Sequence, residues 1–287
     1  MATSALRERM RSILHTRNYS PRTIETYIGQ VARFAKHYGL SPEILGAKEV
    51  TEYQVAMRER GVSATLFNQA MCALKFLYKE VLERDDIAER IPFARSEKRL
   101  PIVLSIEETI TFLQSIENER YRVLMVTIYS AGLRLSEALN LRGRDIDSSR
   151  MVIHVQQGKG KKDRYVPLSP VVLEMLREHW KREHLRDLLF PAEKDPSHPI
   201  TSSTVQRYLK RAQQKSGLHK YVTAKTLRHC YATHMIENGT STRVVQVLLG
   251  HSNVHTTETY THVTPRTLQN SISPLDRVVS QLKPKPE

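Results

Sequence analysis

Two arginines, a histidine and a tyrosine stand where their chemistry could be used. Arg134 lies in SAGLRLSEALNL, directly after a glycine break, and Arg228 lies within the half-apolar run TLRHCYATHM. A charged group enclosed by apolar neighbours requires an anionic partner. His251 follows Gly250, where an apolar helix is expected to end, and Tyr260 comes nine residues after the histidine. These residue types suit a phosphodiester: arginines grip its oxygens bidentately, and a tyrosine hydroxyl can form a covalent phosphotyrosine.

Each of these residues also has an ordinary structural explanation when it is taken alone. Arg134 could be a partly exposed arginine paired with Glu137, three residues along the chain. A lone tyrosine such as Tyr260 is more often a packed aromatic than a nucleophile. The catalytic interpretation therefore depends on the pieces occurring together.

Histidines and cysteines are dense enough near these residues to raise the question of a zinc site. Only His251 and His255 have the spacing of one helix face, and the sequence holds no C-x-x-C pair. The segment GKGKK imitates a phosphate-binding loop but lacks the P-loop pattern. We therefore expect no metal and no cofactor. The residues weighed as metal ligands are His229, Cys230, His234, His251, His255 and His262.

The elements that must position these residues begin with helices in the first third of the chain. Ser20 can cap a helix that starts at Pro21, where the missing N–H of proline costs nothing, and Gly39 ends it. Apolar residues between these limits recur at spacings of three and four, which predicts one buried stripe. The stripe consists of Ile24, Tyr27, Ile28, Val31, Phe34 and Ala35.

Two further helices complete a small all-helical bundle. Thr51 and Gln54 suggest a capping box for a short helix ending at Gly61. Ser63 can cap a longer helix that runs to about Leu82. The inner face of the longer helix is predicted to hold Leu66, Ala70, Ala73, Leu74 and Leu77.

The remainder of the chain mixes helices with one short β element. Ser105 and Glu108 form a capping box, and the apolar helix YRVLMVTIYS should be buried and end at Gly132. Residues 151–168 alternate apolar and polar positions around the lysine-rich GKGKKD, which predicts a β-hairpin. From about Thr201 the pattern is helical again. The predicted fold class is therefore mainly α with a small antiparallel β element.

The chain is long enough for two domains, and a basic stretch divides it. The segment IPFARSEKRLPIVLS has prolines at both ends of its basic residues and no helical period, which is typical of a linker. We predict a helical domain over residues 1–92, a linker over 93–101 and a second domain over 102–287. The 287 residues include 44 Lys and Arg against 30 Asp and Glu, a net charge of +14, and both halves are basic.

This charge points first to a nucleic acid held between two domains, with an anionic membrane surface as the rival. No apolar run approaches the roughly 20 residues needed to span a bilayer. The start MATSALRERM lacks the apolar stretch of a secretory signal, and the two cysteines, Cys72 and Cys230, lie far apart. We expect a cytoplasmic, DNA-associated protein.

Four motifs together resemble the tyrosine recombinases, the family that includes phage integrases, integron integrases and the bacterial recombinases that resolve chromosome dimers. AGLRLSE resembles the first arginine box, GKGKKDRYVPL the catalytic-lysine hairpin, LRHCYATH the second arginine box and LLGHSNVHTTETYTHV the histidine–tyrosine box. The resemblance covers nearly the whole chain. It implies an N-terminal SAM-like core-binding domain and a catalytic domain. It also implies catalytic roles for Arg134, Lys159, Arg228, His251 and Tyr260, with Tyr260 as the nucleophile.

One position departs from the family pattern. The family usually places a histidine three residues before the second arginine, and Lys225 stands there in this sequence. Type IB topoisomerases, which share the catalytic domain, tolerate a lysine at this place. This departure leaves the reaction class unaffected, but it removes a neutral imidazole that could act as a base. Lys225 is therefore expected to act mainly as a hydrogen-bond donor to the DNA phosphate.

The resemblance implies a site-specific recombinase that cuts and rejoins DNA through a 3′-phosphotyrosine and exchanges strands between two sites, without ATP or metal. Its partners would be double-stranded recombination sites and three further copies of the chain in a tetramer, with room for an accessory DNA-bending protein and no membrane. Two alternatives remain: a type IB topoisomerase-like relaxation enzyme, which Lys225 slightly favours, and a catalytically silent DNA-binding protein of the same fold.

Overall fold

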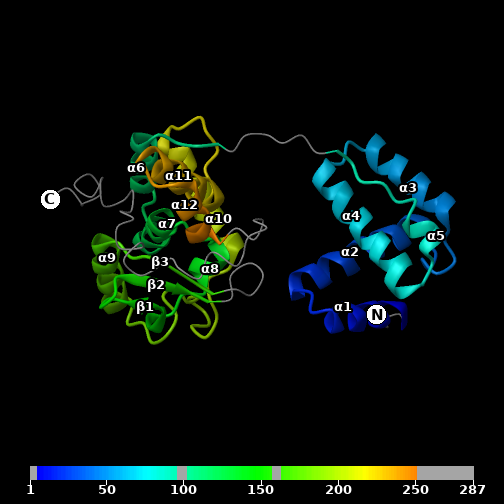
Figure 1. The fold of residues 1–287 in the computed structure, drawn as a ribbon, viewed down its shortest axis with the longest axis horizontal. Coiled ribbons are helices and arrows are strands. Elements are labelled where there is room, and N and C mark those ends of the chain that lie inside the picture. The colour runs from blue at the N-terminus through cyan, green and yellow to red at the C-terminus, as the bar shows by residue number, and fades with distance from the viewer. Residues whose placement is uncertain (1–4, 96–101, 157–162, 251–287) are drawn as a thin grey trace. The chain divides into compact units, whose positions relative to one another are not determined.

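The computed structural model describes residues 5–95, 102–156 and 163–250 (Figure 1). The chain separates into two compact units, Met1–Arg99 and Leu100–Glu287. Part of the predicted linker, residues 96–101, lies outside the described residues. No helix within the described ranges is long and apolar enough to cross a membrane.

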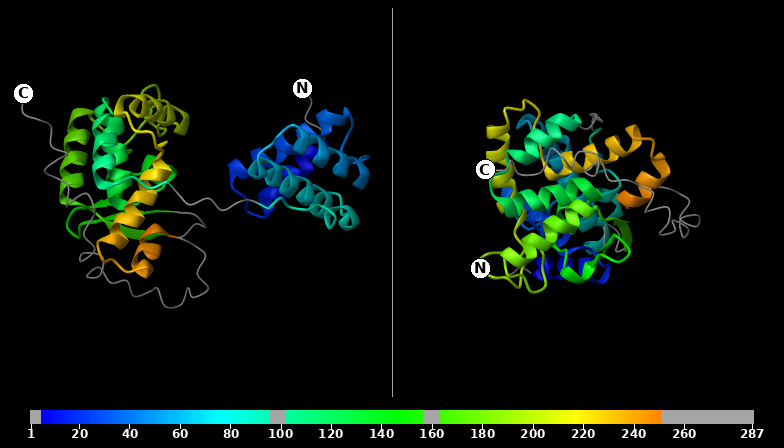
Figure 2. Two further views of the ribbon diagram at one scale, coloured as in Figure 1. Left: turned by 90° about the horizontal axis from the view of Figure 1, so that it is seen from above. Right: turned by 90° about the vertical axis from the view of Figure 1, so that its left-hand side faces the viewer.

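The first unit is a bundle of helices. Its elements are α1 (Ala5–Thr16), α2 (Pro21–Tyr38), α3 (Ala47–Glu59), α4 (Ala64–Phe76) with its π-helical continuation η1 (Leu77–Val81), and α5 (Asp85–Ala88). The limits of α2 are as predicted: the Ser20 hydroxyl accepts a hydrogen bond from the Thr23 amide, and Gly39 ends the helix at φ 68°. Helices α2 and α4 pack side by side (Figures 1 and 2).

Two local predictions for this unit are wrong. Helix α3 begins at Ala47 rather than near Thr51, because the Glu49 carboxylate accepts a hydrogen bond from the Gly46 amide at 2.7 Å and caps the helix there. Leu66 is 37% exposed, and Phe67 occupies the inner face of α4 in its place. The aromatic ring removes more apolar surface from water than the leucine would.

The second unit places its helices around a small sheet. Its elements are α6 (Ile106–Gln114), α7 (Glu119–Ala131), α8 (Leu135–Leu139), η2 (Gly143–Asp145), β1 (Ile146–Asp147), β2 (Val152–Val155), β3 (Arg164–Pro167), α9 (Pro170–Arg182), α10 (Ser202–Ser216), α11 (Ala224–Glu237) and α12 (Thr242–Leu249). Helix α7 is central and packs against α6, α8, α9 and α11 (Figure 1). The predicted fold class is confirmed.

The limits of α6 and α7 follow from the predicted signals. Ser105 and Glu108 form the expected capping box, each side chain accepting from the other residue's backbone amide. Gly132 ends the buried α7 at φ 61°. A Cβ atom on Gly132 would lie 2.4 Å from the Tyr231 ring, so no larger residue fits there without a shift. The chain can therefore turn sharply from α7 into α8.

The predicted hairpin is present as strands β2 and β3, which pair with Val155 opposite Arg164. A third strand, β1, was not predicted, and it pairs with β2 to give an antiparallel sheet of order β1-β2-β3. Strand β1 is only two residues long, too short to show an alternating pattern in the sequence. Residues 157–162, which include Lys159, lie outside the described residues.

Candidate active site: a buried arginine cluster

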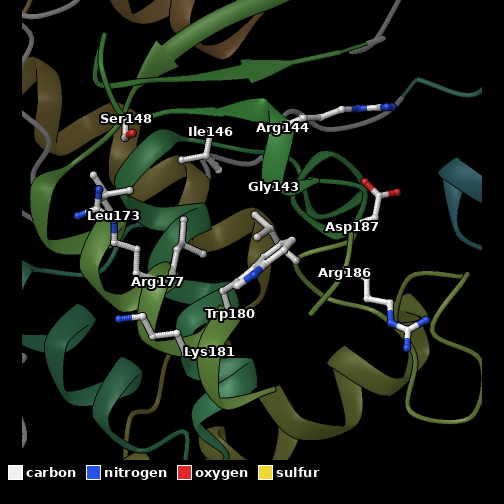
Figure 3. A pocket seen from close by; sticks show the side chains of 12 residues that line it. Gly143, Arg144, Ile146, Ser148, Leu173, Arg177, Trp180, Lys181, Arg186 and Asp187 are labelled. Carbon is white, nitrogen blue, oxygen red and sulfur yellow. The ribbon is translucent and has the colours of Figure 1, made fainter. Parts of the chain in front are cut away.

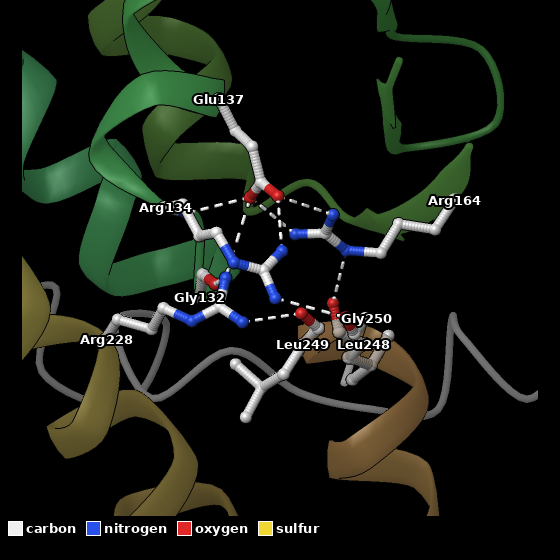
Figure 4. A network of polar contacts seen from close by, with 8 residues as sticks. All are labelled: Gly132, Arg134, Glu137, Arg164, Arg228, Leu248, Leu249 and Gly250. Atoms are coloured by element: carbon white, nitrogen blue, oxygen red, sulfur yellow. Dashed lines mark hydrogen bonds and ion pairs between the residues drawn. The ribbon is translucent and has the colours of Figure 1, made fainter. Parts of the chain in front are cut away.

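Three arginines from three different elements converge on one glutamate (Figure 4). Arg134 is the N-cap residue of α8, Glu137 lies in the first turn of that helix, Arg164 opens strand β3, and Arg228 lies on α11. We call these four residues the arginine cluster. It assembles where the glycine turn after α7, the hairpin and α11 meet.

Glu137 is the hub of the arginine cluster. Its Oε1 atom accepts hydrogen bonds from Arg134 Nη1 at 2.6 Å and from Arg164 Nη1 at 3.0 Å. Its Oε2 atom accepts from the Arg134 backbone amide at 2.8 Å and from Arg164 Nη2 at 2.7 Å, and Arg228 Nη1 lies 3.5 Å away. The glutamate side chain is only 5% exposed. A charged network of this kind is stable only because its members satisfy one another.

The same three arginines also hold the end of α12. Arg164 Nε donates to the carbonyl of Leu248 at 2.7 Å, Arg228 Nη2 to that of Leu249 at 2.5 Å, and Arg134 Nη2 to that of Gly250 at 3.1 Å. These carbonyls have no partner within the helix, and the C-terminal end of a helix carries partial negative charge. The arginines therefore fix the point from which the chain continues to His251.

Gly250 itself is required at this junction. It ends α12 in the left-handed conformation at φ 61°. A Cβ atom there would lie 3.1 Å from Cδ of Arg164. Glycine avoids both the strain of a positive φ and the crowding against the arginine.

The charges of the cluster are strongly coupled. Burial alone would raise the pKa of Glu137, but its hydrogen bonds with Arg164 and Arg134 and the charge of Arg164 outweigh burial and lower that pKa to about 2. Burial and the neighbouring charge of Arg134 lower the pKa of Arg228 to about 10. Glu137 and Arg228 are thus both charged at neutral pH. Three guanidinium charges and one carboxylate charge leave two positive charges, which suits a phosphate with charge developing on its oxygens.

The structure brings together two of the six residues predicted for the site. Arg134 and Arg228 meet in the cluster, and the pairing of Arg134 with Glu137 that was weighed as an alternative is also present. Lys225 lies on α11 one turn before Arg228 and is exposed. Lys159, His251 and Tyr260 lie outside the described residues.

His229 follows Arg228 on α11 and has a lowered pKa. Burial is the main cause, and the positive charges of Lys225 and Arg228 add to it. The imidazole is therefore neutral at pH 7. His229 therefore adds no positive charge to this part of α11, where Lys225 and Arg228 supply the cations.

Sequence reasoning missed Arg164. Its side chain is 9% exposed, nearly as buried as that of Arg228. The alternation of side chains along a strand could have indicated that Arg164 is buried. Arg164 lies on the same face of the strand as Val166, two residues further on, and Val166 is fully buried. An arginine on the core face of a strand must have a buried acceptor.

Two of the residues weighed as metal ligands have structural partners instead. Nδ1 of His234 lies 2.8 Å from the Tyr129 hydroxyl, and its Nε2 lies 2.9 Å from the Leu104 carbonyl oxygen. The sulfur of Cys230 accepts a hydrogen bond from the Leu104 amide. Within the described ranges, no group of three His, Cys, Asp or Glu residues could hold a metal ion.

A pocket of about 530 Å³ lies elsewhere in the second unit, between α9 and the η2–β1 segment (Figure 3). Trp180 forms part of its wall and lies against Gly143, where a Cβ atom would be 2.9 Å from the indole ring. Basic side chains from Arg144, Arg177 and Lys181 surround the pocket. It contains no member of the arginine cluster, so it is not the candidate active site.

Comparisons with known proteins agree on one family. Residues 103–267 match the phage integrase family, and residues 6–87 match the phage integrase N-terminal SAM-like domain. "Putative integrase/recombinase y4qK" of Sinorhizobium fredii is 39% identical over 278 residues, which cover 96% of this chain and 90% of that protein. Tyrosine recombinase XerA of Pyrococcus horikoshii is 31% identical over 95% of this chain and 94% of its own.

A solved structure shares the fold. The lambda integrase(75-356) dimer bound to a COC′ core site matches with a TM-score of 0.69 and 22% identity, over 88% of this chain and 96% of that one. The family matches extend over both units, and the relatives are matched over nearly their full lengths. This chain belongs to the phage integrase family of site-specific tyrosine recombinases.

Proposed function

We propose that this chain cuts and rejoins DNA at specific sites with Tyr260 as the nucleophile, and that Arg134, Arg228, Lys159, Lys225 and His251 assist it. The observation that carries this proposal is the arginine cluster. Two arginines from the predicted boxes converge on one carboxylate and hold the end of α12, directly before the segment that contains the histidine and the tyrosine.

The reaction follows from the chemistry of these groups. The Tyr260 hydroxyl gives its proton to water as its oxygen attacks the phosphorus, the bond to the 5′-oxygen breaks, and a 3′-phosphotyrosine forms. Lys159 gives a proton to the leaving 5′-oxygen, and the two arginines bind the non-bridging oxygens as charge builds on them. A 5′-hydroxyl from the second site then attacks the phosphotyrosine and releases Tyr260. The phosphotyrosine conserves the energy of the bond, so the proposed reaction needs no ATP. The two arginines neutralise the charge on the phosphate oxygens, so it needs no metal for that purpose.

The exposed face of α10 supports DNA as the substrate. This helix has no acidic residue, and it carries four cations, Arg207, Lys210, Arg211 and Lys215. The guanidinium groups of Arg207 and Arg211 lie 6.0 and 5.7 Å from the centre of the Tyr208 ring. Ordered cations on one helix face are suited to a row of phosphates.

We also propose that the chain acts as a tetramer on two DNA duplexes. A lambda integrase tetramer bound to a Holliday junction matches this chain with a TM-score of 0.68. Apolar residues follow Tyr260 in a part of the sequence that lies outside the described residues, and we propose that they dock on a neighbouring copy; they include Leu268, Ile272, Val278 and Leu282. Truncation after Thr264 should then reduce strand exchange more than single-site cleavage, and equal loss of both activities would contradict this docking.

The proposal is tested with a nicked suicide duplex. Sequencing the junctions formed in cells that express the protein identifies the exchange site, and a duplex with a nick beside the scissile phosphate traps the covalent adduct. Tyr260→Phe should bind this duplex normally but form no adduct. Tyr165→Phe is the matched control, because Tyr165 is an exposed tyrosine on β3, and this variant should form adduct as the wild type does.

The same duplex, together with a supercoiled plasmid, separates the alternatives. A catalytically silent DNA-binding protein would give no adduct from any variant. A type IB topoisomerase-like enzyme, which the lysine at position 225 favours, would relax a supercoiled plasmid that lacks the exchange site. A site-specific recombinase should relax that plasmid poorly and give the adduct only when the site is present.

A further inference from the structure

We infer that Arg164 is a positioning residue for cleavage: it neutralises Glu137, so that this carboxylate does not compete with the DNA phosphate for the donors of Arg134 and Arg228. The inference rests on the proposed function, because it assigns Arg134 and Arg228 to the phosphate.

The contacts of Arg164 differ from those of the other two arginines. It binds Glu137 bidentately, through Nη1 to Oε1 at 3.0 Å and Nη2 to Oε2 at 2.7 Å, and its Nε donates to the Leu248 carbonyl. Each of its three nitrogens therefore already has a protein acceptor, and its side chain is 9% exposed. Both terminal nitrogens of Arg164 are thus committed to the Glu137 carboxylate, whereas those of Arg228 donate to the Gly132 and Leu249 carbonyls.

Arg134 is placed differently, and Figure 4 shows the contrast. It gives one terminal nitrogen to Glu137 and the other to the carbonyl of Gly250, and its side chain is 23% exposed. Arg228 reaches Glu137 only at 3.5 Å. Arg134 therefore gives the carboxylate one side-chain nitrogen where Arg164 gives two, and Arg228 lies farther from it than either. Each terminal nitrogen of an arginine also has a second N–H.

Removal of Arg164 would change what the carboxylate does. A buried carboxylate has about four acceptor positions, and it must fill them or lose stability. Without Arg164, Glu137 would take further N–H groups from Arg134 and Arg228, the groups that the phosphate needs. The cluster would also fall from two positive charges to one.

The loss should be reversible by removing the carboxylate charge. In Arg164→Met, the pKa of Glu137 would rise, because Arg164 supplies the largest lowering contributions. Acidification would then protonate Glu137 and release Arg134 and Arg228. Glu137→Gln would have the same effect at every pH.

The experiment measures single-turnover adduct formation by the full chain on the nicked suicide duplex that the wild-type chain cleaves. Arg164→Met should form adduct about tenfold or more slowly, the scale on which a small displacement of a reacting group acts. Arg164→Lys, which keeps the charge, should lose less. The double variant Arg164→Met with Glu137→Gln should be faster than Arg164→Met, although Glu137→Gln alone should not exceed the wild type.

The pH dependence supplies a second readout that a purely structural role would not move. The rate of Arg164→Met relative to the double variant should rise as the pH falls from 8 to 5.5, and wild type should show no such relative gain. If thermal melting shows that Arg164→Met does not fold, Arg164→Lys with and without Glu137→Gln carries the same comparison.

Three results would overturn the inference: a wild-type rate for Arg164→Met, no gain in the double variant, or parallel pH profiles. A wild-type chain that forms no adduct would instead contradict the proposed function.

Discussion

Two groups of cations in the second unit are built in opposite ways. In the arginine cluster, the side chains of Arg134, Arg164 and Arg228 are 23, 9 and 8% exposed, and all share one carboxylate. On α10, the cations lie on an exposed face of a helix without acidic residues, and Lys215 pairs with Glu117 from outside that helix. The side chains of the arginine cluster are held in place by hydrogen bonds and ion pairs with their neighbours. Those on α10 are placed mainly by the helix backbone.

The difference indicates a division of labour. Buried charges act in a medium of low effective dielectric and in fixed directions, so they can discriminate a transition state from a ground state. Exposed charges are screened by salt within about 10 Å and can turn towards any phosphate, so they add affinity without directing chemistry. We expect the arginine cluster to govern the rate of cleavage and α10 to govern the strength of binding.

The largest effect should come from Arg228→Lys. The substitution keeps the charge but loses the planar fork that holds the Gly132 and Leu249 carbonyls together. Adduct formation should slow by roughly 10²- to 10³-fold, the usual cost of one preorganised donor. Gel-shift affinity for the same duplex should change little.

Arg211→Lys is the matched control for that prediction, because it makes the same exchange on the exposed face of α10. Its adduct rate and its affinity should both stay close to wild type. Equal loss of rate in the two variants would break the proposed division between buried and exposed cations.

Acid should weaken the fold through Glu137. Its folded pKa of about 2 lies below the ordinary value of 4.5, so its stabilisation is complete above pH 4.5 and is lost as the pH falls towards 2. The difference corresponds to about 3 kcal/mol. Urea unfolding at both ends of this window should show that wild type loses about that much more stability than Glu137→Gln; parallel losses would show that Glu137 is not the acid-sensitive group.

The parts of the fold that local chemistry determines could be predicted from the sequence. Ser20, Ser105 and Gly132 set helix ends by their own hydrogen bonds or backbone conformation, and the structure confirms all three. The start of α3 could not be read in this way, because Gly46 has no side chain to act as a cap. Glu49 performs that function from inside the helix.

The candidate site was predictable only in part, for a tertiary reason. Arg134 and Arg228 stand beside recognisable glycine breaks and apolar runs, but no local pattern shows that α8, β3, α11 and the end of α12 meet at Glu137. The contacts of Glu137 with Arg164 and Arg228 form only because these elements come together in the folded chain. The strand pattern around Val166 gave a signal for Arg164, but its partner lies 27 residues away in the chain.

Lys225 should have a smaller effect than Arg228, because it is exposed at the start of α11 rather than held in the cluster. If it donates a hydrogen bond to the phosphate, Lys225→His should stay substantially active, since imidazole can also donate. Lys225→Ala should slow adduct formation by roughly tenfold, the lower part of the range for one lost catalytic group, with little change in affinity. A wild-type rate for the alanine variant would remove Lys225 from the site.

The smallest effects should come from single charges on α10, and they should appear in binding rather than in rate. Lys210→Gln and Arg211→Gln each remove one exposed cation from this helix. Each should weaken binding only a few-fold at moderate salt and reduce the slope of log affinity against log salt by about one, as expected for one lost phosphate contact.

Arg177→Gln provides the control for charge alone, because Arg177 is an exposed arginine on α9 that pairs with Glu174. It removes the same charge from the chain without removing a cation from α10. If it lowers the salt slope as much as the α10 variants do, affinity depends on overall charge and not on that helix. If the α10 variants instead slow single-turnover cleavage at saturating DNA, the exposed cations also direct the chemistry, and the contrast with the buried cluster fails.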